Sequence, residues 1–188
     1  MRLFVSVDLP EDLAAGIERV QARFEDASGL DPVDPTRAHV TLKFLGEVDA
    51  ERLPDVEDAL DRAVESVDVA PFDATVAGLG VFPSLSYISV VWVGVEDDGQ
   101  LTRLHDAVER EFVERGFDPE DHDFTPHVTV GRVRHAGGKE VIQRVVEEDS
   151  PTVGTMRVGS VALTESTLTD EGPAYRTVRR VPLRGDAE

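Results

Sequence analysis

A duplicated pattern of histidine and threonine is the feature of this sequence best suited to chemistry. His39-Val40-Thr41-Leu42 is echoed much later in the chain by His127-Val128-Thr129-Val130. Residues two apart in a β-strand face the same side, so each copy would present an imidazole and a hydroxyl on one face and aliphatic side chains on the other. The chain contains five histidines, and two of them in the same short pattern are hard to attribute to chance.

Two such strands facing each other across a cleft could cleave a phosphodiester. One neutral imidazole could take a proton from water, and one imidazolium could donate a proton to the leaving alkoxide, because histidine titrates near pH ~6.5. The hydroxyls of Thr41 and Thr129 could donate to phosphate oxygens as charge builds up in the transition state. We therefore predict that His39 and His127 are catalytic, that the threonines bind substrate, and that no metal or cofactor is needed.

The periodicity of the apolar residues predicts strands separated by helices, which is typical of the α+β class. Both motifs fall on expected strands. No linker rich in glycine or serine divides the chain, so we expect a single domain over residues 1–188. The expected strands are residues 3–7, 37–45, 72–79, 87–95, 127–133, 153–168 (one or two strands) and 175–183. The expected helices are residues 10–24, 49–67, 101–112 and 138–148.

The charge balance excludes several classes of protein. Aspartate and glutamate total 38 and lysine and arginine total 19, a formal net charge of −19, which argues against a broad basic face for nucleic acid. The absence of cysteine excludes disulfides, thiolate metal sites and cysteine nucleophiles. No apolar run approaches the ~20 residues of a membrane helix, and the N-terminus lacks the features of a signal peptide, so we expect a cytoplasmic protein with no membrane partner.

The choice of basic residues favours a halophilic origin. Lysine occurs only at Lys43 and Lys139, and the remaining basic residues are arginine. Dense carboxylates retain water and cations in concentrated salt, where their mutual repulsion is screened within ~3 Å at 1 M. The alternative is an ordinary acidic protein.

Several segments in the same order resemble the 2H phosphoesterases, and most closely the RNA 2′,3′-cyclic phosphodiesterase branch, historically called 2′-5′ RNA ligases. The resemblance extends over nearly the whole chain. The segments are Arg2-Leu3-Phe4-Val5, His39-Val40-Thr41-Leu42-Lys43-Phe44-Leu45-Gly46-Glu47, Gly80-Val81-Phe82-Pro83, Val91-Trp92-Val93-Gly94-Val95, Phe124-Thr125-Pro126-His127-Val128-Thr129-Val130-Gly131-Arg132 and Gly172-Pro173-Ala174-Tyr175.

The resemblance implies a bilobal fold, in which two antiparallel sheets of pseudo-symmetric lobes face a central cleft and helices pack on the outside. It implies metal-independent hydrolysis of RNA 2′,3′-cyclic phosphate ends to 2′-phosphates, with RNA ends or small cyclic nucleotides as substrates of a monomer. Two alternatives remain open: a 2′-5′ RNA ligase acting on tRNA halves, and a nucleotide-binding module without catalysis. One departure is the segment Ser84-Leu85-Ser86-Tyr87, where the family usually carries a basic residue.

Two basic residues are further candidates for binding substrate. The resemblance implies a phosphate-binding role for Arg132, although its offset from His127 would put it on the opposite face of a regular strand. Either Gly131 permits a bulge that turns Arg132 inward, or its long side chain reaches around the strand end. Lys43 lies four residues after His39, so a regular strand would place both on one face and Lys43 could balance phosphate charge. The alternative for Lys43 is a solvent-exposed side chain at a strand end.

Two weaker hypotheses concern Phe4 and the segment before the second motif. Phe4 shares its expected strand face with polar residues, so it could stack on a nucleobase or belong to the core. His122, Asp123 and His127 could in principle form a metal site, but no second ligand motif accompanies them.

Overall fold

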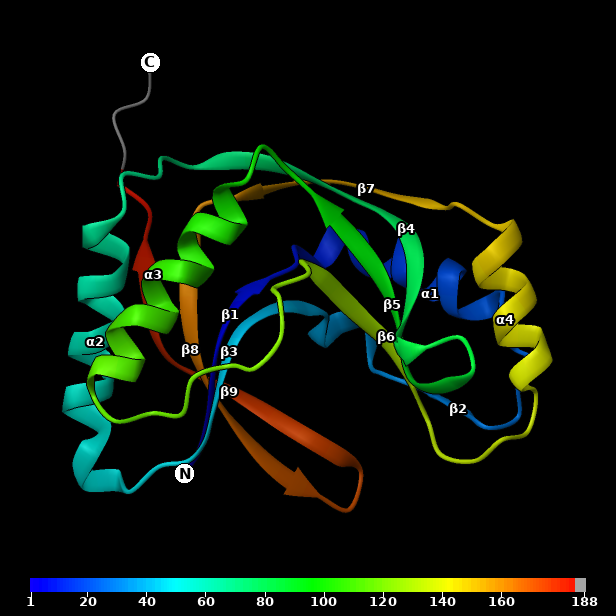
Figure 1. Ribbon diagram of the computed structural model, residues 1–188, viewed down its shortest axis with the longest axis horizontal. Coiled ribbons are helices and arrows are strands. Elements are labelled where there is room, and N and C mark those ends of the chain that lie inside the picture. Colours follow the sequence, from blue (N-terminus) through cyan, green and yellow to red (C-terminus); the bar gives the residue numbers. More distant parts are fainter. Residues whose placement is uncertain (185–188) are drawn as a thin grey trace.

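A computed structural model describes residues 1–184, so the last four residues of the expected 1–188 domain lie outside the described part. Within it, nine strands form one curled antiparallel sheet (Figure 1). The order along the sheet is β7-β4-β5-β6-β3-β1-β8-β9, and β2 pairs with β6. The strands are β1 (Arg2–Asp8), β2 (Leu30–Pro32), β3 (His39–Glu47), β4 (Phe72–Ser84), β5 (Tyr87–Glu96), β6 (His127–Val133), β7 (Thr152–Val158), β8 (Ser160–Thr169) and β9 (Gly172–Pro182).

The helices lie on the outside of the sheet in two pairs (Figure 1). The helices α2 and α3 pack against each other, with α3 on β3 and α2 on β8 and β9. The helix α1 contacts β6 and β7, and α4 contacts β4. The bounds are α1 (Ala14–Ala22), α2 (Leu53–Ser66), α3 (Gln100–Glu114) and α4 (Lys139–Glu148), with short 3-10 helices at Glu11–Leu13, Pro35–Arg37 and Ala50–Arg52. None of the helices described is both long and apolar enough to cross a bilayer.

The two expected sheets are two halves of this single sheet. One half contains β3, β1, β8 and β9, and the other contains β6, β5, β4 and β7. They meet where β3 and β6 pair at Val40 and Val128. The α+β class and the antiparallel arrangement with outer helices are therefore confirmed, and the two motifs occupy the adjacent central strands.

Alternation of side chains along the central strands separates the core from a polar face. Leu3, Val5 and Val7 of β1 and Val40 of β3 are buried beneath the helices. The helices complete this core with apolar stripes at helical spacing, as the sequence predicts. The stripe residues include Ile17 and Val20 of α1, Val56 and Leu60 of α2, Leu104, Val108 and Phe112 of α3, and Ile142 and Val145 of α4.

The two motif strands each contain a β-bulge directly after the His-x-Thr sequence. In β6, Thr129 pairs with Trp92 whereas Gly131 already pairs with Val91, so Val130 is the extra residue. As a result, Val130 and Gly131 are both buried, and Arg132 returns to the polar face and is exposed. The bulge predicted at Gly131 is confirmed.

The bulge in β3 contradicts the placement expected for Lys43. Thr41 pairs with Ser6 and Lys43 pairs with Val5, the next residue of β1, so Leu42 is the extra residue. Lys43 therefore faces the core with Leu42, and it is 1% exposed. The prediction that Lys43 shares the face of His39 was wrong, because it assumed a regular strand.

Candidate active site

The four residues of the duplicated motif lie together on the polar face at the centre of the sheet. Because β3 and β6 are antiparallel and pair at Val40 and Val128, their register puts Thr129 opposite His39 and Thr41 opposite His127. Each imidazole thus has the hydroxyl of the other motif as its neighbour across the strands. All four side chains are half-buried, whereas the valines between them face the core.

Both imidazoles are held in the same way by the backbone. The Nδ1 atom of His39 lies 3.0 Å from the carbonyl oxygen of Arg37, and that of His127 lies 2.6 Å from the carbonyl oxygen of Thr125. A carbonyl oxygen only accepts, so Nδ1–H is the donor in each case. The Nε2 atom of each ring is thereby left to accept a proton when neutral or donate one when charged.

The surroundings disfavour the charged form of both rings. Burial lowers the pKa of His39, and the hydrogen bond to Arg37 and the charge of Asp8 oppose this. Burial also lowers the pKa of His127, and the positive charges of His39 and Arg132 lower it further. Since His39 acts on the titration of His127, the two rings titrate as a coupled pair, in which protonation of one disfavours protonation of the other.

Aromatic side chains pack against the imidazole of His39. The ring of Phe4 is stacked on the imidazole at a centroid distance of 4.8 Å, and Tyr175 meets the imidazole edge-on at 5.6 Å. Phe4 is buried on the polar face, outside the core beneath the helices, and its contacts with His39 and Tyr175 leave no open ring face for a base. These contacts fix the ring plane of His39.

A second pair of aromatic residues fixes the ring plane of His127. Phe82 meets this imidazole edge-on at 4.9 Å, and Trp92 lies 5.8 Å away. Gly80 provides the space for the indole, since a Cβ atom at this position would meet the Trp92 ring at 2.1 Å. Sequence reasoning did not assign Phe82, Trp92 or Tyr175 to the site, although their position on the polar face of strands beside the motifs was a usable signal.

Equivalent positions in the two motifs supply different chemistry. The bulges bring Arg132 and Phe44, each five residues after its histidine, onto the polar face. Arg132 is near enough to both imidazoles for its charge to lower the pKa of each. Phe44 is 63% exposed and lies 6.2 Å from Phe4. The face therefore combines a guanidinium suited to phosphate with an exposed ring suited to a base.

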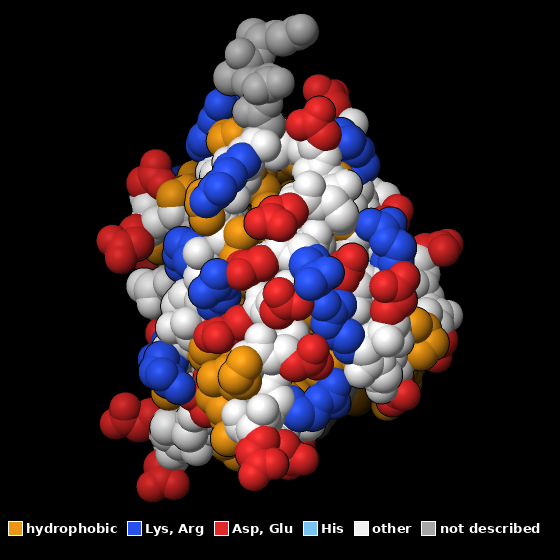
Figure 2. All heavy atoms as spheres, turned by 90° about the vertical axis from the view of Figure 1, so that its left-hand side faces the viewer, with side chains coloured by type: hydrophobic (Ala, Val, Ile, Leu, Met, Phe, Trp, Pro, Cys, Tyr) orange, Lys and Arg blue, Asp and Glu red, His pale blue; other side chains and the backbone are white. Residues whose placement is uncertain are grey.

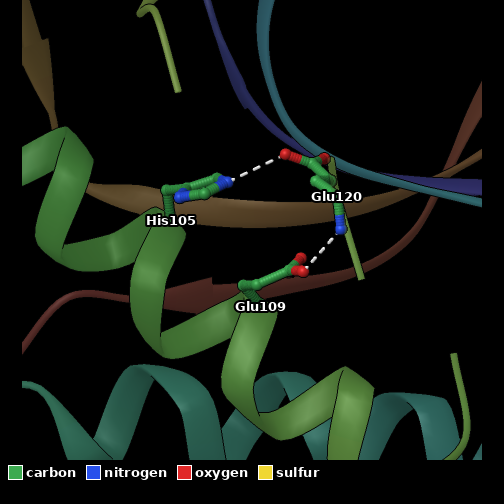
Figure 3. Close-up of side chains that lie close together, drawn as sticks. All are labelled: His105, Glu109 and Glu120. Carbon is green, nitrogen blue, oxygen red and sulfur yellow. Dashed lines mark hydrogen bonds and ion pairs between the residues drawn. The ribbon is translucent and has the colours of Figure 1, made fainter. Parts of the chain in front are cut away.

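Lys43 belongs to a buried polar network behind the site (Figure 3 shows its neighbours). Its ammonium group lies 2.6 Å from Oε2 of Glu109 and donates to the carbonyl oxygen of Asp118 at 2.9 Å. Burial raises the pKa of Glu109, but the hydrogen bonds from Lys43 and from the Glu120 backbone N–H outweigh it and hold the pKa below its usual value. Lys43 is therefore a structural cation and does not reach the polar face.

The same network contains the one group of three potential metal ligands among residues 1–184. It consists of His105, Glu109 and Glu120, with His105 Nε2 3.1 Å from Glu120 Oε2 (Figure 3). Its carboxylates are engaged by Lys43 and by backbone or imidazole N–H groups, so the donor set fits a hydrogen-bonded brace better than a cation site. His122, Asp123 and His127 do not assemble into a comparable group.

Comparison with known proteins identifies the class. A profile of the 2′-5′ RNA ligase superfamily matches residues 9–170. Together with the paired His-x-Thr strands, this match shows that the chain belongs to the 2′-5′ RNA ligase superfamily, whose members are 2H phosphoesterases.

Individual relatives are similar over almost their whole length. The chain is 37% identical over 179 residues to an RNA 2′,3′-cyclic phosphodiesterase of Archaeoglobus fulgidus, covering 95% of this chain and 98% of the relative. An RNA 2′,3′-cyclic phosphodiesterase of Methanothermobacter thermautotrophicus is 37% identical over 177 residues, with coverage of 93% and 95%. Among solved structures, TT0787 of Thermus thermophilus has a TM-score of 0.83 at 30% identity, covering 100% of both chains. LigT of E. coli in complex with 3′-AMP has a TM-score of 0.77 at 26% identity, covering 97% of both chains.

Proposed function

We propose that this protein hydrolyses the 2′,3′-cyclic phosphate ends of RNA to 2′-phosphates by acid-base catalysis with His39 and His127, without a metal ion. The observation that carries the proposal is the pair of imidazoles on adjacent strands, each with Nδ1 held by a backbone carbonyl. Binding a nucleotide does not require two proton carriers oriented in this way, so a purely binding module explains the geometry less well. The names of the relatives support the same reaction.

The reaction needs one proton to be taken and one to be given. We assign His127 as the base, whose Nε2 accepts a proton from water as the water oxygen attacks phosphorus. His39 is then the acid, whose Nε2–H protonates O3′ as the P–O3′ bond breaks, which leaves the phosphate on O2′. The near-equivalence of the two strands makes the reverse assignment the natural alternative, and in either case one ring is neutral and the other charged.

Charge on the phosphate is met by donors on the same face. Thr41 and Thr129 flank the two imidazoles in the register of β3 and β6, and Arg132 lies close to both rings. Hydroxyl and guanidinium donors aimed at the phosphate oxygens stabilise the transition state as negative charge builds up on them. Phe44 is positioned to stack on the terminal base.

The charge of the chain makes these local contacts essential. Figure 2 shows the side of the molecule covered by α2, where basic and acidic side chains alternate and form no broad basic patch. Arginines there are neutralised in ion pairs, such as Arg62 with Asp58 at 2.8 Å and Arg179 with Asp61 at 2.5 Å. We therefore propose that RNA is captured by the polar face of the central strands, because long-range attraction is absent at a net charge of −19.

The composition and the site also bear on the setting of the enzyme. Both histidines come from one chain and lie on neighbouring strands, so the proposed site is complete in a monomer. The scarcity of lysine supports a halophilic enzyme.

The decisive experiment uses a defined oligonucleotide ending in a 2′,3′-cyclic phosphate, incubated with the protein before and after exhaustive chelation. We expect a 2′-phosphate product at the same rate in both samples. Formation of a 3′-phosphate, or loss of turnover that returned on adding a divalent metal, would contradict the proposed mechanism. Adding tRNA halves with a free 5′-hydroxyl tests the ligase, because a 2′-5′ linkage forms if that hydroxyl replaces water.

A further inference from the structure

A pocket of about 240 Å³ lies beyond the carboxyl end of β6, between the β4–β5 turn and the start of α4. Ile88, Val133 and Ile142 form its apolar part. This volume is below the ~300–1,000 Å³ typical of sites for drug-sized ligands, so the pocket suits a single unit of an extended ligand. Its polar lining consists of Ser86, Tyr87, Ser89, Arg134, His135 and Lys139.

The polar lining is cationic although the chain is strongly acidic. Since Lys43 is buried in an ion pair, Lys139 is the lysine left to meet a ligand, and it lines this pocket. Arg134 is 66% exposed and pairs with Asp31, itself 55% exposed, at 3.2 Å. An exposed pair of this kind contributes little to stability, so the guanidinium can exchange the carboxylate for a phosphate.

An exposed aromatic ring stands beside these cations. Tyr87, at the first position of β5, is 70% exposed. The turn before it is fastened to α4, because Lys139 donates to the carbonyl oxygen of Ser86 and Gln143 donates to that of Leu85 at 2.7 Å. A ring on a fixed turn next to cationic groups is the combination that binds single-stranded nucleic acid, by stacking a base and neutralising phosphates.

The pocket lies where the strand that carries His127 ends. Along β6, His127, Thr129 and, after the bulge, Arg132 occupy the polar face; the strand ends at Val133, and Arg134 follows it directly in the chain. At ~3.3 Å per residue, Arg134 lies roughly 20 Å from His127 along the strand. That distance exceeds the length of one nucleotide and corresponds to a short stretch of RNA.

We propose that this pocket binds the RNA strand on the 5′ side of the cyclic end, with Arg134 and Lys139 contacting phosphates and Tyr87 stacking on a base. The inference rests on the proposed function and narrows its substrate class to RNA chains in preference to cyclic mononucleotides. Asp31 and Glu140 limit the charge of the region, so binding depends on the stacked base as well as on the phosphates.

The test compares a cyclic mononucleotide with a ten-nucleotide RNA ending in a 2′,3′-cyclic phosphate, at one fixed salt concentration. We expect the wild type to have the higher kcat/KM for the longer substrate. Tyr87→Ala and Arg134→Gln should each lower the ratio of kcat/KM for the oligonucleotide to that for the mononucleotide about five- to tenfold, mainly through KM. The matched control is Arg157→Gln, because Arg157 pairs with Asp73 at the same 3.2 Å, with 64% and 65% exposure, on the far strand β7. It should leave the ratio unchanged.

Direct binding separates this inference from the proposed function. Fluorescence anisotropy of a labelled oligonucleotide ending in a 2′-phosphate should show about five- to tenfold weaker binding for Arg134→Gln than for Arg157→Gln. Equal ratios and equal affinities for Tyr87→Ala, Arg134→Gln and wild type would overturn the inference even if cyclic phosphates are hydrolysed. Weaker binding by the variants, with no hydrolysis by the wild type, would refute the proposed function and retain the RNA site.

Discussion

Replacing Lys43 by methionine should destabilise the protein strongly, although this residue lies outside the polar face. Methionine preserves the length of the side chain but removes the ammonium group that binds Glu109 at 2.6 Å and the carbonyl oxygen of Asp118 at 2.9 Å. The Glu109 carboxylate would then remain as a largely buried charge with the Glu120 backbone N–H as its remaining donor. The contacts that join β3 to Glu109 and to the segment that leads to His127 would be lost.

The size of the effect follows from the burial of the two partners. Removing one partner of a buried ion pair costs ~3–5 kcal/mol. Glu109 retains 21% side-chain exposure and one hydrogen bond, so part of its charge is solvated. We expect a loss of about 2–3 kcal/mol in the free energy of unfolding, or roughly 5–10 °C in Tm for a chain of this length. The double variant Lys43→Met/Glu109→Gln should recover part of the loss, because no unpaired charge remains.

The measurement is urea unfolding followed by circular dichroism at fixed KCl, since guanidinium chloride would change the ionic strength. Arg62→Met is the control, because Arg62 pairs with Asp58 at 2.8 Å on the exposed surface, and it should change stability by less than ~0.5 kcal/mol. A Lys43→Met variant as stable as this control would show that the network is not a stabilising brace. A double variant less stable than Lys43→Met would refute the argument from unpaired charge.

Three further outcomes follow from the site and the composition. His39→Ala and His127→Ala should each lower kcat by ~10²–10⁴-fold and the double variant should be little worse, whereas Thr41→Ala and Thr129→Ala should lose less; a folded histidine variant with near-wild-type turnover would exclude the pair. Because burial lowers the pKa of both rings, kcat/KM should peak on the acidic side of pH ~6.5, and a rate rising steadily from about pH 5 to 9 would contradict this. The folded state binds these protons less readily than the unfolded chain, so the protein should lose stability as pH falls through ~6.5. Activity and thermal stability should both rise from low salt toward molar KCl, as screening weakens repulsion among the carboxylates and between protein and RNA, and a steady loss of activity in a folded sample would count against a halophilic origin.

The sequence was sufficient to predict the parts of the site that depend on strand alternation. The spacing of His39 and Thr41, and of His127 and Thr129, placed each pair on one face because both segments are regular up to the threonine. The strand Leu30–Pro32 was not predicted, since three residues ending in proline carry no alternating pattern, and it forms through pairing with β6.

The bulges explain where prediction succeeded and where it failed. Gly131 gave a visible reason to expect an irregular strand, so the placement of Arg132 on the same face as His127 could be anticipated. The equivalent position in β3 is Lys43, and nothing in its local sequence indicates the same irregularity, because the extra residue Leu42 is an ordinary strand former. Comparing the two motifs position by position would have transferred the bulge from one to the other.

The interleaving of the two halves of the sheet has a consequence for how the molecule folds. The half that carries His39 needs β1 and β3 from the start of the chain and β8 and β9 from its end, whereas the half that carries His127 is covered by α1, which is also made early. Neither half is a continuous stretch of sequence. All the strands of the half that carries His127 have been synthesised by Val158, whereas the half that carries His39 cannot fold to completion before Ser160–Pro182 has been synthesised. We therefore expect one cooperative unfolding transition. During synthesis, both histidines are made before the β1–β8 pairing that completes the sheet can form.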